Sequence, residues 1–149
     1  MGANSIDPIK FEVIKNGFDT LVDQMAITVM RSAHSPTIKD AMDYSTAFCD
    51  RLGRVVAQGL NIPLHLGSFP DVLANLLQQY EGNVSEDDIF ILNDPYSAGG
   101  IHLPDIYIIK PVFVLGELEG FAATVGHHAD VGGIVPGSNS THSREIYQE

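Results

Sequence analysis

The chain has 149 residues, of which 44% are hydrophobic, and its formal net charge is -11 at pH 7. This length and apolar fraction predict one globular domain with a substantial core, and the single cysteine excludes an internal disulfide. The acidic balance disfavours unassisted binding to nucleic acid or to an anionic membrane, because both surfaces are themselves negative. No signal-peptide pattern and no apolar run of membrane-spanning length is recognisable, so we expect a cytoplasmic protein.

A long helix is predicted at the start of the chain. Asp7 is a suitable N-cap and Pro8 suits the first helical position, whereas Pro36 should end the helix at or before residue 35. Near that end, Arg31 and His34 could reach a ligand or could simply complement the helix dipole. Apolar residues recur at helical spacing and predict a face packed in the core, formed by Ile14, Phe18, Leu21, Val22, Met25 and Val29.

Two short strands are expected next, at residues 45–49 and 55–58, joined by a turn that contains Gly53. Cys49 has no neighbouring base that would activate it, so we interpret it as a buried thiol. An extended linker over residues 62–67 should follow.

A second helix should begin at Ser68, with Asp71 as its capping-box partner, and should end at residues 82–83. His65 lies just before this helix and could approach a metal site formed elsewhere. The helix is predicted to bury Val72, Leu73, Leu76, Leu77 and Tyr80.

A buried strand is predicted at residues 89–92, and a polar, glycine-rich loop follows it at 93–100. Loops that leave a buried strand often carry functional residues. Asp94 is therefore either a ligand or orienting residue, or the first residue of an Asx turn before Pro95. The later segment 132–138 is also glycine-rich, but it lacks the lysine of a P-loop, so we expect no nucleotide site in this chain.

Two clusters, His102 to Asp105 and His127 to Asp130, combine imidazoles with carboxylates. Such groups bind zinc, manganese or iron, and such an ion can polarise a carbonyl or activate water. Isolated histidines are more often packed or solvated, but the β-rich segments 106–114 and 119–125 between the clusters predict a hairpin that would bring them together.

A two-residue loop at Gly116 and Glu117 would place Asp105 opposite His128 in this hairpin, and a slip of one residue would present His127 instead. The spacing leaves both histidines open as ligands. Pro111 lies inside the first strand and indicates an edge position or a bulge.

Several segments resemble the hydantoinase B/oxoprolinase family, which includes N-methylhydantoinase B, the corresponding region of 5-oxoprolinase, and subunits of acetone and acetophenone carboxylases. The resemblance is spread over nearly the whole chain and rests on residues 35–40, 65–68, 90–96, 102–105 and 127–133. It implies an α+β fold with a long first helix, a second helix and antiparallel hairpins. Family B subunits are longer, so we expect residues 1–149 to be the N-terminal part of such a domain.

The resemblance also implies a division of labour between subunits. The B-type subunit would carry a divalent metal held by His102, Asp105 and one of the paired histidines, with His127 favoured over His128, and Asp94 and Asp130 would be catalytic residues beside the ligands. An A-type partner would bind ATP and activate the carbonyl of a cyclic amide. Two alternatives remain, a subunit of a carboxylase acting on a ketone and a non-catalytic assembly piece.

Overall fold

The computed structural model describes residues 6–149, and the start of the segment in which a signal peptide was sought lies outside them. The helices are α1 (Pro8–Ser32), α2 (Pro36–Lys39) and α3 (Phe69–Gln79), with 3-10 turns η1 (Pro63–His65), η2 (Pro136–Ser138) and η3 (Ile146–Gln148). The strands are β1 (Tyr44–Asp50), β2 (Val55–Gln58), β3 (Phe90–Leu92), β4 (Asp105–Val114) and β5 (Glu117–His127). The predicted α+β class is confirmed.

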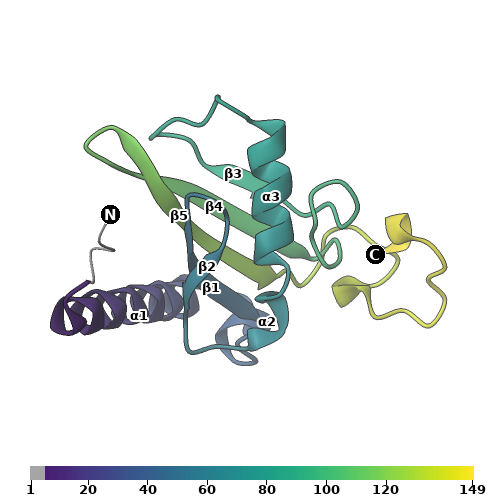
Figure 1. Ribbon diagram of the computed structural model, residues 1–149. Helices are drawn as coiled ribbons and strands as arrows, with labels where there is room; N and C mark the ends of the chain where they lie inside the picture. The colour runs from purple at the N-terminus through teal and green to yellow at the C-terminus, as the bar shows by residue number, and fades with distance from the viewer. Residues whose placement is uncertain (1–5) are drawn as a thin grey trace.

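Within residues 6–149, five strands form one antiparallel sheet in the order β2-β1-β5-β4-β3. Helix α3 packs on one face of the sheet, and α1 crosses the other face at β1 and β2 (Figure 1). None of the helices in this part of the chain combines the length and apolarity needed to cross a membrane.

The main core lies between α3 and the sheet, where successive rows of cross-strand partners face the helix. One row is Ala47, Ala123 and Ile109, each fully buried, and the next row contains Val125 and Tyr107. Because side chains alternate along a strand, the same face continues to Asp105 on β4 and to His127 on β5. The core face of the sheet therefore ends in ionisable residues.

Helix α1 has the predicted ends, and the Asp7 side chain accepts a hydrogen bond from the amide of Ile9. The predicted buried face is confirmed in part: Val22 is fully buried, and the partly buried residues are Phe18, Met25 and Val29. It is wrong at two positions, because Ile14 is 57% exposed and Leu21 is 39% exposed. The main contacts of α1 with the sheet are to β1 and β2, and the N-terminal end of the helix extends away from the rest of the fold (Figure 1).

The first hairpin and α3 form where predicted, and burial raises the pKa of the Cys49 thiol to about 12. Two details around α3 differ from the prediction. The linker contains the 3-10 turn η1 instead of being extended. The expected capping box is not formed, because the Ser68 hydroxyl donates to the carbonyl of His65 and also meets the hydroxyl of Tyr107 at 2.6 Å.

Strand β3 was predicted to be buried, but it forms an edge of the sheet and Ile91 is 70% exposed. Its sequence is apolar on both faces, whereas only the α3 face is covered. Pro111 lies beyond the last β4 residue that pairs with β3, so β4 is a local edge there, as one of the two predicted positions requires. Pro111 itself pairs with Phe121, and the bulge lies beyond it, between Val112 and Phe113.

The β4–β5 hairpin has a different loop from the one predicted. Val114 pairs with Glu117, so the loop consists of Leu115 and Gly116, both with positive φ. The bulge between Val112 and Phe113 then shifts the register by one residue, because β5 has one more residue there than β4. As a result, Asp105 pairs with His127 instead of His128. The one-residue slip that spacing left open is the arrangement that the structure contains.

Candidate metal centre

The candidate site lies at the end of the α3-covered face of the sheet, where three neighbouring strands contribute ionisable residues. Asp105 pairs with His127 across β4 and β5. The amide of His127 donates to the carbonyl of Asp43, which directly precedes β1. The row formed by Asp43, His127 and Asp105 therefore continues the apolar rows of the core.

His102 reaches this row from the loop that precedes β4. Its Nε2 atom lies 3.3 Å from Oδ1 of Asp105, and its ring centroid lies 5.0 Å from that of His127. The loop is held by its backbone, because the side-chain amide of Asn93 donates to the carbonyl of Leu103 at 2.8 Å. The structure thus brings His102, Asp105 and His127 together, as the sequence predicted.

His65 closes the site from the side of α3 and is almost completely buried. The Ser45 hydroxyl donates to the carbonyl of Ile62 at 2.6 Å, so it meets Nδ1 of His65 at 3.0 Å as an acceptor. The other ring nitrogen, Nε2, faces carboxylate oxygens of Asp43 and Asp105, each at 3.6 Å.

Two buried atoms of the site have no hydrogen-bond partner: Oδ1 of Asp105 and Nδ1 of His127. Burial alone would raise the pKa of the Asp105 carboxyl, but His65 and the charges that His102 and His127 carry when protonated outweigh it, so the pKa lies below its ordinary value. Unpartnered buried polar atoms are rare in folded proteins, and they indicate a ligand, an ion or water.

The donor types fit a divalent transition metal, since two imidazoles and a carboxylate suit zinc, manganese or iron. The arrangement is not closed, because no three histidine, cysteine or carboxylate side chains in residues 6–149 converge tightly enough to hold an ion as they stand. Metal binding would therefore require these side chains to rearrange.

The other predicted site residues lie outside this cluster of contacts. His128 is exposed, and its backbone amide donates to the carbonyl of Pro104. Asp94 and Asp130 are exposed and accept amide hydrogen bonds from residues two positions later, as in Asx turns. Arg31 and His34 are also exposed.

Sequence reasoning did not single out Asp43 or Ser45. Neither has a local signal, because each joins the site only through its position at the start of β1 and through contacts with His65. Their alternation with the apolar residues of β1 could have suggested a shared face. Their distance of about sixty residues from His102 hid the connection.

The sequence model of the hydantoinase B/oxoprolinase family matches residues 7–149. The chain is 38% identical to 5-oxoprolinase 1 of Arabidopsis thaliana over 100% of its length, which is 12% of that protein. It resembles the crystal structure of an ATP-dependent caprolactamase from Pseudomonas jessenii with a TM-score of 0.87 and 34% identity, over 98% of this chain and 25% of that one.

A third comparison matches the nucleotide-free structure of an acetone carboxylase, with a TM-score of 0.81 and 26% identity, over 89% of this chain and 18% of that one. The chain thus spans about a quarter or less of the length of these relatives. The predicted resemblance is confirmed, and the chain belongs to the hydantoinase B/oxoprolinase family.

Proposed function

From this family membership, we propose that the chain is the metal-binding part of an ATP-dependent hydrolase of cyclic amides, acting with an A-type subunit that binds ATP. Two of the relatives are named for related substrates, 5-oxoproline and caprolactam, which are both cyclic amides. The observation that carries the proposal is the meeting of three side chains at one hairpin end: His102 approaches the unpartnered Oδ1 of Asp105 to 3.3 Å, and His127 lies opposite Asp105 with its ring 5.0 Å from that of His102.

In this proposal, His102, Asp105 and His127 are the metal ligands. The lowered pKa of Asp105 keeps the carboxylate ionised at neutral pH, which provides an anionic oxygen donor. When bound there, a divalent cation would polarise an amide carbonyl or activate water for attack.

The surrounding residues have supporting roles. Ser45 fixes the ring orientation of His65, and His65 in turn holds Asp105 in place from the buried side. Tyr107, in the next row of the same sheet face, is fully buried, and its hydroxyl meets that of Ser68. The exposed side is formed by His102, whose side chain is 27% accessible, so substrate would approach there. Asp94 and Asp130 remain candidate catalytic residues at the margin of the site.

A second candidate function is a subunit of an ATP-dependent ketone carboxylase, and the similarity to an acetone carboxylase supports it. The same ligand set would serve both reactions, because a cation can hold an amide carbonyl or an enolate oxygen. The two functions differ in their co-substrate. Only the carboxylase requires bicarbonate and a ketone.

The first experiment measures metal content. Elemental analysis and titration calorimetry with manganese and zinc should show about one ion bound per chain, because the donor set fits one ion. His102→Ala and Asp105→Asn should each weaken binding by about tenfold or more, since each removes a ligand. His128→Ala is the matched control, because this exposed neighbour of His127 should leave metal binding unchanged.

Wild-type affinity in both His102→Ala and Asp105→Asn would reject this ligand set. A chain that binds an A-type subunit but no metal would support a non-catalytic assembly role instead. With an A-type subunit present, ATP turnover that depends on 5-oxoproline or caprolactam without bicarbonate supports the hydrolase. Turnover that requires bicarbonate and a ketone supports the carboxylase.

A further inference from the structure

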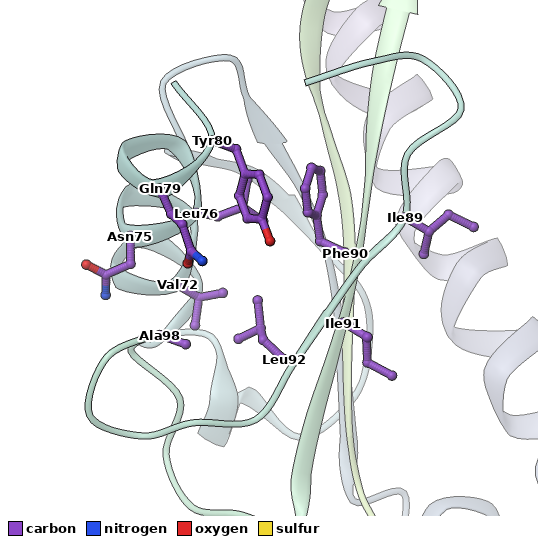
Figure 2. A pocket seen from close by; sticks show the side chains of 10 residues that line it. All are labelled: Val72, Asn75, Leu76, Gln79, Tyr80, Ile89, Phe90, Ile91, Leu92 and Ala98. Carbon is purple, nitrogen blue, oxygen red and sulfur yellow. The ribbon is translucent and has the colours of Figure 1, made fainter. Parts of the chain in front are cut away.

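Strand β3 is apolar on both faces although it forms an edge of the sheet. Phe90 and Leu92 pack toward α3, while Ile89 and Ile91 point away from it and are 64% and 70% exposed (Figure 2). Edge strands usually carry charges, proline or bulges that block further pairing. Residues 89–92 contain no charge or proline, and their pairing with β4 has no bulge.

The opposite edge of the sheet has features that block pairing with a further strand. Strand β2 pairs with β1 through a register shift between Phe48 and Cys49, and α1 packs against it. The two edges therefore differ: β2 is an edge that the fold has blocked, whereas β3 has the composition of an interior strand.

A pocket of about 320 Å³ lies between α3 and β3. Its walls are an α3 face that includes Leu76 and Tyr80, all four residues 89–92, and Ala98 (Figure 2). The Tyr80 ring packs on Phe90 with a centroid distance of 4.9 Å, which leaves the space beside Leu92 open. A strand added alongside β3 would place alternate side chains into this pocket and the others beside Ile91.

We propose that the free edge of β3 accepts a further β-strand that is apolar on both faces and has neutral or basic flanking residues. We assign this strand to the part of a longer subunit that lies outside the matched region. The caprolactamase chain supports this assignment, because only 25% of its length is matched and about three quarters of it is left to provide such a strand.

Charge disfavours a second copy of this chain as the occupant. In an antiparallel pairing of two β3 strands centred on Ile91, Asp88 of one copy would lie opposite Asp94 of the other. Like charges directly opposite each other destabilise strand pairing. Glu86 and Asp87 extend the acidic flank, and the net charge of -11 on each chain adds further repulsion. The same carboxylates would attract basic residues that flank a different strand.

The test uses the 149-residue chain and a short peptide of alternating valine and isoleucine with an arginine at each end. Binding should slow amide hydrogen exchange in residues 90–92 by about tenfold or more, because new backbone hydrogen bonds form there. A matched peptide with a glutamate at each end should bind about tenfold more weakly, since it meets the acidic flanks of β3.

Ile91→Lys should abolish binding of the arginine peptide, because a lysine on an edge strand blocks pairing. Val56→Lys, on the other edge, should leave binding unchanged. No slowing of exchange with the arginine peptide, or equal binding of the two peptides, would overturn the proposal. A chain that dimerises with residues 90–92 already protected would overturn the assigned occupant. In a subunit of full family length, the corresponding strand should be protected without peptide, and an unprotected strand there would also count against it.

Discussion

The two ends of the sheet hold a carboxylate in opposite ways. At one end, Asp50 closes the turn between β1 and β2: one oxygen accepts the amides of Leu52 and Arg54, and the other accepts the Arg54 guanidinium at 2.7 Å. Burial would raise the pKa of Asp50, but hydrogen bonds from Arg54 and Leu52 and the Arg54 charge lower it below its ordinary value. Every partner lies within four residues.

At the other end, Asp105 is surrounded by residues from distant parts of the chain. Its neighbours His65, His102 and His127 come from the segment before α3, the loop before β4, and the end of β5. Its Oδ1 atom is buried without a hydrogen-bond partner. The comparison shows that a lowered pKa alone does not distinguish a structural carboxylate from a candidate ligand. The unused hydrogen-bonding capacity of Asp105 does distinguish it.

The largest expected effect comes from a substitution in the core that joins the two ends. Leu73 is fully buried on α3, and it packs so closely under the first turn that a Cβ on Gly53 would approach its Cβ to 2.9 Å. Leu73→Ala should lower the free energy of unfolding by about 2–5 kcal/mol, because it leaves a cavity. Urea denaturation measures this loss.

The matched control lies on the other face of the sheet. Ile108 is 46% exposed there, so Ile108→Ala should lower the free energy of unfolding by less than about 1 kcal/mol. Equal losses in the two variants would show that both faces are covered in solution and that the α3-covered face is not the main core of the sheet.

A smaller effect is expected at the site end alone. Ser45 is fully buried and its hydroxyl serves both the carbonyl of Ile62 and Nδ1 of His65. Ser45→Ala leaves both groups without this partner and should destabilise the fold by about 1–3 kcal/mol. It should also weaken metal binding, since the ring of His65 loses its orientation. Ser97→Ala, at an exposed serine that contacts Asp94, is the control and should change neither quantity measurably.

Much of the fold could be predicted because its signals are local. The cap at Asp7, the turn at Gly53 and the breaks before Pro36 and after α3 each depend on residues a few positions apart. The register of the β4–β5 hairpin depends on two features without a clear local signal. Leu115 adopts positive φ, which is uncommon for leucine, and the bulge at Val112 adds one residue. The predicted pairing of Asp105 with His128 failed for these reasons.

The candidate site could be predicted in part for the same physical reason. His102, Asp105 and His127 lie on one hairpin, so their meeting follows from one strand reversal. Asp43 and His65 join them through a tertiary arrangement of β1 and η1 that no short-range pattern encodes. The apolar sequence of β3 predicted a buried strand, which is wrong for one of its faces, because composition does not reveal which faces the rest of the fold covers.

The smallest expected effect concerns the locally satisfied carboxylate. A double-mutant cycle of Asp50→Asn and Arg54→Gln should give a coupling energy of about 0.2–1 kcal/mol at pH 7, since the pair is near the surface. The folded pKa of Asp50 lies below the unfolded value of about 3.9, so this contribution is fully present above about pH 4. It is lost as the pH falls through the folded pKa, because the proton then binds the folded state as well.

Urea denaturation of the four proteins of this cycle at pH 7 and below the folded pKa of Asp50 measures the change. A coupling that persisted unchanged in acid would mean that packing of the Arg54 stem, not the carboxylate charge, holds the turn together. Asp105 should differ, because its interactions are shared among three imidazoles. No single histidine variant should return the pKa of Asp105 to its ordinary value, because the other two imidazoles still stabilise the carboxylate. The carboxylate would therefore stay ionised when one of those imidazoles turns toward a metal ion.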